Sequence, residues 1–131
     1  MTVDANKVMP VAAFSTIEFS TIGYGSGDVL RAAISAAGNG DNTVVAAVAT
    51  KKIKVLGVVL KAAGAVNVRF ESGASGTALT GVMSMFANDP GVVVPIAPMG
   101  EHWFETAAGA LLNLELSGAV QVSGFIVYYV E

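Results

Sequence analysis

Short runs in which apolar and polar residues alternate recur along the chain after residue 43. In Val66–Glu71, valine and phenylalanine alternate with asparagine, arginine and glutamate, and Leu112–Leu116 has leucine at every second position. Val120–Ser123 alternates in the same way. A period of two residues places one set of side chains on a buried face and the other on a face open to solvent or to a partner. These runs therefore predict half-buried β-strands.

Other segments are apolar on both faces. Ile53–Lys61 is a nearly continuous apolar run, and Phe125–Val130 is β-branched and aromatic throughout, which favours a central or interface strand. Four shorter strands are also predicted: Thr43–Ala49, Val82–Phe86, Gly91–Ile96 and Trp103–Thr106.

Residues typical of turns separate these runs. Glycine supplies positive φ, asparagine and aspartate support turns through side-chain hydrogen bonds, and proline presets φ. Such turns about every 8–12 residues, without a long amphipathic helix, predict an all-β fold, a β-sandwich or jelly-roll-like domain. The predicted loops are Gly38–Asn42, Ala63–Gly64, Gly73–Gly76, Asn88–Gly91 and Pro98–Gly100.

One segment near the start of this domain is ambiguous. Asp28–Ala37 could place Val29 and several alanines on one face of a helix. Alternatively, Leu30–Ser35 forms a strand that pairs with Thr43–Ala49 through the loop Gly38–Asn42, and we favour this strand.

Residues 1–27 differ in character from the rest of the chain. They end in the glycine-rich stretch Gly23–Gly27, which suggests an N-terminal arm and hinge before a β-sandwich domain at 28–131. In this interpretation Ala12–Phe19 adds to a neighbouring subunit, whereas in the simpler alternative Val11–Phe19 is an ordinary first strand. The candidate contact residues of the arm are Phe14, Ile17 and Phe19.

The composition raises the question of where the apolar surface goes. Apolar residues make up 53% of the 131 residues and charged residues 13%, against about 25% charged in typical soluble domains. A membrane span needs about 20 mostly apolar residues, but the long uncharged stretch Ser72–Asn88 is interrupted by glycine, serine and threonine. We therefore expect no membrane segment and favour burial of apolar surface between subunits.

Charge is segregated along the chain. Residues 43–70 contain five Lys or Arg and no acid, while residues 71–131 contain six Asp or Glu and no base. Lys51, Lys52 and Lys54 are candidate interface residues that would meet an acidic neighbour or an acidic segment of the same chain, or they protect an edge strand from aggregation. The low isoelectric point of about 5.0 and the absence of aromatic residues from 43–69 argue against nucleic-acid binding.

Few residues offer catalytic or metal-binding chemistry. The sequence has no cysteine and a single histidine, His102, so a zinc site is not expected. There is no nucleophile elbow and no phosphate-binding glycine motif. We predict that the protein is not an enzyme, with no cofactor and no metal. Trp103 and Phe104 are either anchors at a subunit contact or packing residues of the core.

Residues 30–131 resemble small structural proteins of tailed bacteriophages. The stretches that carry the resemblance are Ala33–Ala36, Gly40–Val48, Lys51–Leu56, Ala63–Gly73, Ala78–Gly81, Trp103–Gly109 and Leu112–Gly124. Some members of this group are head decoration, or cement, proteins, whose β-sandwich or jelly-roll subunits trimerise on the capsid lattice. The resemblance implies no catalytic residues.

The resulting expectation is a virion structural protein on the capsid surface. It would form a homo-oligomer, in particular a homotrimer, and would contact the major capsid protein, without nucleic-acid or membrane partners. The alternative is a tail or head-fibre component with a receptor- or glycan-binding role. A small hydrolase using His102 is a third and distant hypothesis.

Overall fold

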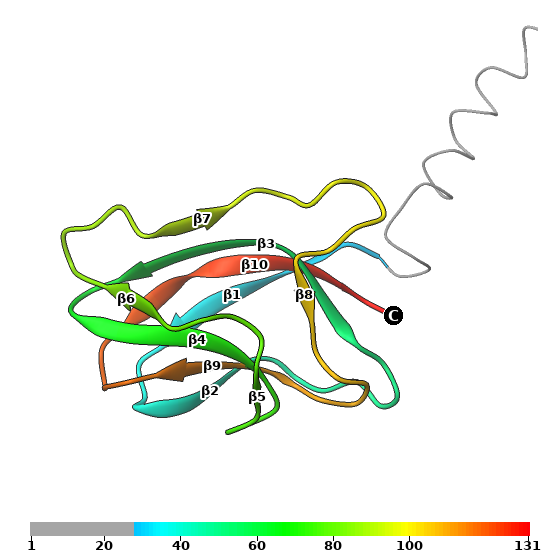
Figure 1. Ribbon diagram of the computed structural model, residues 1–131, viewed down its shortest axis with the longest axis horizontal. Helices are drawn as coiled ribbons and strands as arrows, with labels where there is room; N and C mark the ends of the chain where they lie inside the picture. Colours follow the sequence, from blue (N-terminus) through cyan, green and yellow to red (C-terminus); the bar gives the residue numbers. More distant parts are fainter. Residues whose placement is uncertain (1–27) are drawn as a thin grey trace, which may run out of the picture.

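The computed structural model describes residues 28–131, shown in colour in Figure 1. The predicted arm, with Phe14, Ile17 and Phe19, lies outside the described residues. The described part contains β-strands and no helix. Its strands are β1 (Leu30–Ala36), β2 (Gly40–Val45), β3 (Ile53–Ala62), β4 (Val66–Ser72), β5 (Thr77–Ala78), β6 (Met83–Met85), β7 (Val92–Val94), β8 (Phe104–Glu105), β9 (Leu112–Leu116) and β10 (Val122–Val130).

These strands form two antiparallel sheets that pack on each other (Figure 1). Sheet 1 has the order β1-β10-β3-β7, with β8 also paired to β3. Sheet 2 has the order β2-β9-β4-β5, with β6 also paired to β4. The chain changes sheet after β1, β2, β3, β6, β8 and β9, so the two layers are interleaved in sequence. The prediction of an all-β sandwich is confirmed.

The core lies between the sheets and consists of the inward residues of the alternating runs. Leu114 and Phe70 are opposite each other on β9 and β4, and both are fully buried. From sheet 1, Leu60 and Ile126 enter the same cluster. The ring of Phe104 on β8 lies 5.4 Å from that of Phe70, centroid to centroid. Burial of each such side chain contributes about 1.5–3 kcal/mol, which makes these residues the main source of stability.

β10 runs without interruption through Gly124, so the prediction of two strands, Val120–Ser123 and Phe125–Val130, is wrong. Glycine fits because Gly124 has φ +151°, and a Cβ atom here would lie 1.8 Å from the carbonyl oxygen of Val59 on β3. The glycine therefore permits close strand contact instead of ending a strand. β10 lies between β1 and β3, as expected for a central strand.

β1 is a strand and not a helix, but its predicted pairing is wrong. Leu30 pairs with Tyr128 on β10, whereas β2 pairs with β9 in the other sheet. The chain changes sheets at residues 37–39, where the Asn42 side chain accepts a hydrogen bond from the Gly38 N–H and donates to the carbonyls of Gly38 and Gly40. This local network makes a corner instead of a hairpin.

Several strand ends also differ from prediction. β2 covers Gly40–Val45 instead of Thr43–Ala49, since the last buried residue is Val45 and a turn follows in which the Lys51 N–H donates to the carbonyl of Val48. β6, β7 and β8 are each two or three residues long, within the longer segments predicted for them.

Candidate functional site

The outer face of sheet 1 carries an apolar row that crosses four strands. Ala33 on β1 pairs with Phe125 on β10, Phe125 pairs with Val59 on β3, and Val59 pairs with Val93 on β7. Their neighbours along each strand enter the core, so alternation turns these four side chains outward. Phe125 is 36% exposed and Val93 is 70% exposed. We call Ala33, Phe125, Val59 and Val93 the apolar row.

The loop between β7 and β8 extends this apolar surface. Ala97 is buried with Leu56 and Tyr129 in a small second cluster, and its N–H donates to the Leu56 carbonyl at 2.9 Å. The loop therefore rests on sheet 1 through a backbone hydrogen bond and apolar packing. Its exposed large apolar residues are Ile96, Met99 and Trp103.

Polar side chains border the apolar row on the same face. Ser35, Ser123 and Lys61 pair across β1, β10 and β3 one outward position away, and two further contacts lie at the edges of the face. The guanidinium carbon of Arg31 lies 5.6 Å from the centroid of the Phe125 ring, within the range of a cation–π contact. The indole Nε1–H of Trp103 donates to the carbonyl of Pro95 at 2.7 Å. Such a surface has little to offer chemically, but it can exclude water against a complementary apolar surface.

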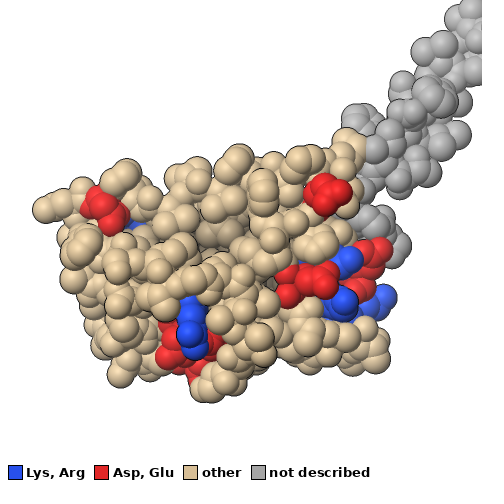
Figure 2. Space-filling model, viewed as in Figure 1, with Lys and Arg blue, Asp and Glu red and all other residues tan. Residues whose placement is uncertain are grey.

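Charged side chains gather in a few groups, while most of the surface visible in Figure 2 is uncharged. One group contains Lys52 and Lys54 with Glu105 and Glu131. Lys52 Nζ lies 3.1 Å from Glu105 Oε2, and Lys54 Nζ lies 2.8 Å from Glu131 Oε1. The predicted pairing of the basic segment with an acidic segment of the same chain is therefore present.

Ionisation in this group follows from its contacts. The hydrogen bond to Glu131 raises the pKa of Lys54. Burial alone would raise the pKa of Glu105, but the hydrogen bond and charge of Lys52, with the charges of His102 and Lys54, hold it below its usual value. The alternative that the lysines protect a sheet edge is wrong, because β3 is paired on both sides, with β10 and with β7 and β8.

The aromatic pair separates into two environments. Phe104 packs against the core and Phe70, while Trp103 is 47% exposed beside the apolar loop. Lys51 is exposed just before β3. A role of Trp103 or the lysines in a subunit contact stays a prediction, and Phe104 has the position of a packing residue.

A carboxylate cluster occupies the outer face of sheet 2. Asp41 on β2 pairs with Glu115 on β9, and Glu115 pairs with Arg69 on β4. Two residues further along β9 and β4, on the same face, Asn113 pairs with Glu71. The carboxyl oxygens of Asp41, Glu71 and Glu115 lie within 4.8 Å of one another.

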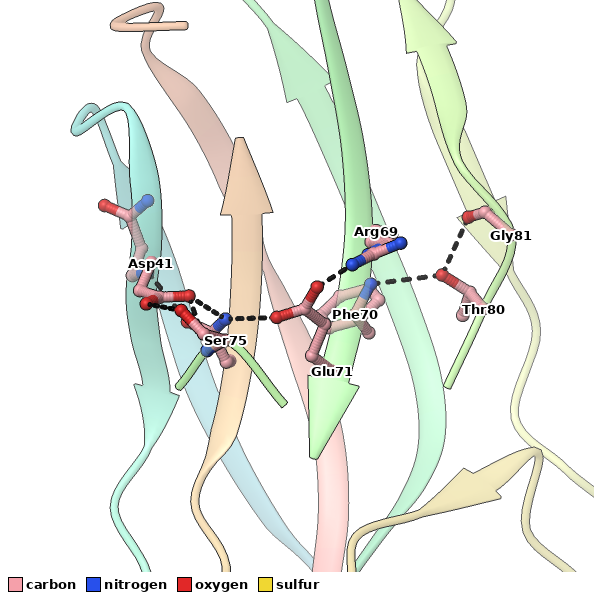
Figure 3. A network of polar contacts seen from close by, with 9 residues as sticks. Asp41, Arg69, Phe70, Glu71, Ser75, Thr80 and Gly81 are labelled. Atoms are coloured by element: carbon pink, nitrogen blue, oxygen red, sulfur yellow. Dashed lines mark hydrogen bonds and ion pairs between the residues drawn. The ribbon is translucent and has the colours of Figure 1, made fainter. Parts of the chain in front are cut away.

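Hydrogen bonds hold this cluster together (Figure 3). The buried Asn113 donates through Nδ2 to Asp41 Oδ1 at 2.8 Å and to Glu71 Oε1 at 3.0 Å. Arg69 Nε lies 2.6 Å from Glu71 Oε2. The N–H and hydroxyl of Ser75, on the turn after β4, donate to the two oxygens of Asp41. The turn is therefore anchored to β2.

The pKa values of two carboxyl groups move apart. The backbone N–H and the hydroxyl of Ser75 lower the pKa of Asp41. The hydrogen bond between Glu115 and Asp41 raises the pKa of Glu115, as do burial and the negative charges of Asp41 and Glu71, with Arg69 opposing. Of these two carboxyl groups, Glu115 is therefore the one that holds a proton more readily.

Carboxylate oxygens are the ligands that Ca²⁺ prefers, so the donor type would suit a hard cation. In the present arrangement, however, Asn113, Arg69 and Ser75 already donate to the oxygens of Asp41 and Glu71. The cluster borders an open groove of about 280 Å³ lined by Asn67, Arg69, Val82, Glu115 and Ser117. We interpret the cluster as a structural hydrogen-bond network beside a shallow polar groove.

The sequence analysis missed this cluster because it treated each strand separately. The outward positions of Val66–Glu71 and Leu112–Leu116 were recognised, but their pairing with Asp41 was not, since β2 was assigned to a hairpin with β1. Alignment of polar positions across β2, β9 and β4 would have indicated it.

Comparisons with known proteins found no relative of this chain. No protein-family model, curated protein or solved structure matches it. Among the described residues, no helix is long and apolar enough to cross a membrane. Function must therefore be argued from the two sheet faces.

Proposed function

We propose that the protein is a structural component of a bacteriophage virion, a head decoration (cement) protein that binds the assembled capsid as a homo-oligomer, in particular a homotrimer. The observation that carries the proposal is the apolar row of Ala33, Phe125, Val59 and Val93, with its extension through Ile96 and Met99. A large exposed apolar surface marks a protein contact, and the resemblance of residues 30–131 to phage structural proteins indicates its setting.

The strand order also supports the proposal. β5 and β6 both pair with β4, and β7 and β8 both pair with β3, so each couple can be counted as one interrupted strand. Counted in this way, the eight strands follow the orders 1-8-3-6 and 2-7-4-5, which supports a jelly-roll arrangement. Jelly rolls occur in viral capsid proteins as well as in lectins, and a shared fold alone does not define a function.

The mechanism would be one of additive contacts. Subunits associate through apolar surface, and each presents the same binding region to neighbouring capsid proteins. Because the subunits are linked, the second and third contacts form at high effective concentration. Modest affinity per subunit then gives durable attachment, and several capsid proteins are held together by one oligomer.

Sedimentation with phage heads tests this function. Purified protein is mixed with heads of the encoding phage that lack it, and the pelleted fraction is measured against protein concentration. We expect saturable binding and heads that withstand heat or low salt better than undecorated ones. Binding to purified tails, or pelleting no greater than that of an unrelated β-sandwich protein of similar size, would contradict the proposal.

A tail or head-fibre component with a receptor- or glycan-binding role is the second candidate. The favouring observations are the exposed ring of Trp103 and the polar groove beside Arg69 and Glu115, since aromatic rings and mixed hydrogen-bonding groups suit sugars. Binding on a glycan array that is lost in Trp103→Ala, or instead in Arg69→Ala, but kept in Phe86→Ala, would support this role over capsid decoration and would show which of the two surfaces binds.

A further inference from the structure

We infer that β1 receives a further strand from a neighbouring copy of this chain, whose residues Ala12–Phe19 pair with its open side. The inference rests on the proposed homo-oligomer and specifies the contact that forms it. Among residues 28–131, β1 pairs with β10 and with no second strand. We call the side of β1 away from β10 the β1 edge.

The β1 edge lacks the features that keep sheet edges from pairing. Natural edge strands are short, bulged or covered, or they carry proline or outward charges. β1 is seven residues long, contains no proline, and keeps a continuous register with β10. Its one charged side chain, Arg31, lies over the Phe125 ring, which directs it toward β10. About half of the backbone N–H and C=O groups of β1 therefore point to a side where another strand can bind them.

The other edge strands of the described part are protected. At the far edge of sheet 1, β7 and β8 are two or three residues long, as are β5 and β6 in sheet 2. β2 has a register shift between Thr43 and Val45, and the turn that carries Ser75 is hydrogen-bonded to its Asp41. Within residues 28–131, β1 is thus the edge best able to accept a strand.

Apolar side chains at the start of β1 are uncovered. Leu30 alternates with Ile34, so it faces the side of sheet 1 on which the core lies. Ile34 is 3% exposed, whereas Leu30 is 42% exposed and Val29 beside it is 51% exposed. A strand added along the β1 edge would bring its own side chains to this side of the sheet and bury part of this surface.

The residues before β1 offer a segment of matching pattern. Residues 1–27 lie outside the described residues and precede β1 directly. As a strand, Ala12–Phe19 would place Ile17 and Phe19 on one face and Glu18 on the other. With the two apolar residues on the side of Leu30, Glu18 stands on the side of Arg31, whose charge is opposite. The segment contains no proline, so each of its N–H groups can donate to a neighbouring strand.

Exchange between copies fits the proposed homotrimer. Residues 20–29 can span at most about 35 Å, which is enough to reach an adjoining copy. The donated strand and the β1 edge are different surfaces, so their contact is heterologous and can close into a ring of three. Each copy then gives one strand and receives one. Pairing of the segment with β1 of its own copy would leave the copies separate, and the tests must distinguish these two arrangements.

The first test measures the mass of the full chain in solution. We expect light scattering after size exclusion to give a multiple of 13.3 kDa. Ile17→Pro removes an N–H from the middle of the added strand and should shift the mass toward one chain. Val3→Pro, a proline in the same region but outside that strand, is the matched control. Neither substitution alters residues 28–131. A monomeric wild type, or an Ile17→Pro oligomer of unchanged mass, would overturn the inference.

The second test identifies the edge and the copy that receives the strand. The chain has no cysteine, so Thr16→Cys combined with Ala33→Cys introduces one thiol in the added strand and one on β1. We expect a bis-maleimide to link these thiols between chains, giving products of two and three chains on a denaturing gel. Thr16→Cys combined with Val93→Cys, on β7 at the far edge of sheet 1, should give much less of these products.

Two outcomes of the second test would overturn the inference. Linkage within single chains only would show that the segment pairs with its own β1, and equal linkage at Ala33 and Val93 would show that it does not bind the β1 edge. Neither test involves phage heads. Exchanged strands in a protein that does not bind heads would refute the proposed function alone, whereas head binding by a protein without exchanged strands would refute this inference alone.

Discussion

Phe125 and Val59 are cross-strand partners whose side chains stand together on the outer face of sheet 1. The backbone of Val59 also requires glycine at position 124 on β10, because the Val59 carbonyl oxygen occupies the space that a Cβ atom at Gly124 would need. The close approach of β3 and β10 at this point therefore brings Phe125 into the apolar row. Strand packing and the proposed contact surface depend on the same pair of strands.

Replacement of Gly124 by alanine should destabilise the protein. The added Cβ would lie 1.8 Å from the Val59 oxygen, so β3 and β10 must separate, at a cost of about 1–3 kcal/mol or more. Gly118→Ala is the matched control, because nothing lies within 4 Å of its added Cβ. Urea denaturation followed by tryptophan fluorescence measures both, and equal midpoints would contradict the packing described here.

Truncation of Phe70 should have a large effect on folding. Phe70 is 1% exposed and packs between the sheets beside Phe104, so Phe70→Ala should lower the free energy of unfolding by about 3–5 kcal/mol. Phe86→Ala, at an exposed site, should change it by less than about 0.5 kcal/mol. A similar loss in both variants, measured by chemical denaturation, would refute the assignment of the core.

Asn113 should be required for the stability of the carboxylate cluster. Its buried amide donates to both Asp41 and Glu71, and its removal would leave a buried carboxylate short of a donor, at a cost of about 1–3 kcal/mol. We expect this loss of unfolding free energy in Asn113→Ala and little change in Asn88→Ala, at an exposed loop position. An unchanged free energy of unfolding in Asn113→Ala would show that the network contributes no net stability.

Stability should depend on pH through Glu115. Its pKa is raised in the folded protein, so its favourable contribution is full below the ordinary value of 4.5 and is lost as the pH rises through the folded value. The lowered pKa of Asp41 acts in the opposite direction, and its contribution is lost as the pH falls below 3.8. The stability that Asp41 contributes should therefore decline as the pH falls below 3.8, and the stability that Glu115 contributes should decline as the pH rises above 4.5.

Glu115→Gln separates these contributions. The amide can still donate to Asp41 but cannot ionise, so the decline in stability as the pH rises above the ordinary value of 4.5 should become shallower in denaturation curves collected over a series of pH values. Glu101→Gln, on the loop before β8, should follow the wild-type profile. A Glu115→Gln profile parallel to the wild type would show that Glu115 does not titrate over these pH values.

Much of the fold could be predicted from local pattern. Alternation in Val66–Glu71 and Leu112–Leu116 identified β4 and β9 because their inward residues face one core. The pairing of β1 could not be predicted, since its partner β10 lies about 90 residues away and both are apolar enough for several neighbours. The division of β10 at Gly124 was predicted wrongly for a related reason. The sequence does not distinguish a glycine that ends a strand from one that allows two strands to approach closely.

The candidate sites were predictable to different degrees. The apolar excess favoured a buried subunit contact, which stays a prediction. The exposed apolar row itself could be found only from the register of Ala33, Phe125, Val59 and Val93, which come from four separate segments. The ion pairs of Lys52 and Lys54 agree with the segregated charges. The buried Asn113 and Glu71 were missed because local alternation places both on an outward face, and the turn that carries Ser75 folds back toward that face.

Cryo-electron microscopy of the virion that this protein is proposed to decorate tests the central claim most directly. We expect density for the β-sandwich on the capsid surface, in symmetric oligomers whose apolar rows of Phe125 and Val93 are covered by a neighbouring protein. Density confined to the tail, absence of the protein from the virion, or a capsid-bound subunit whose sheet 1 face is open to solvent would contradict it.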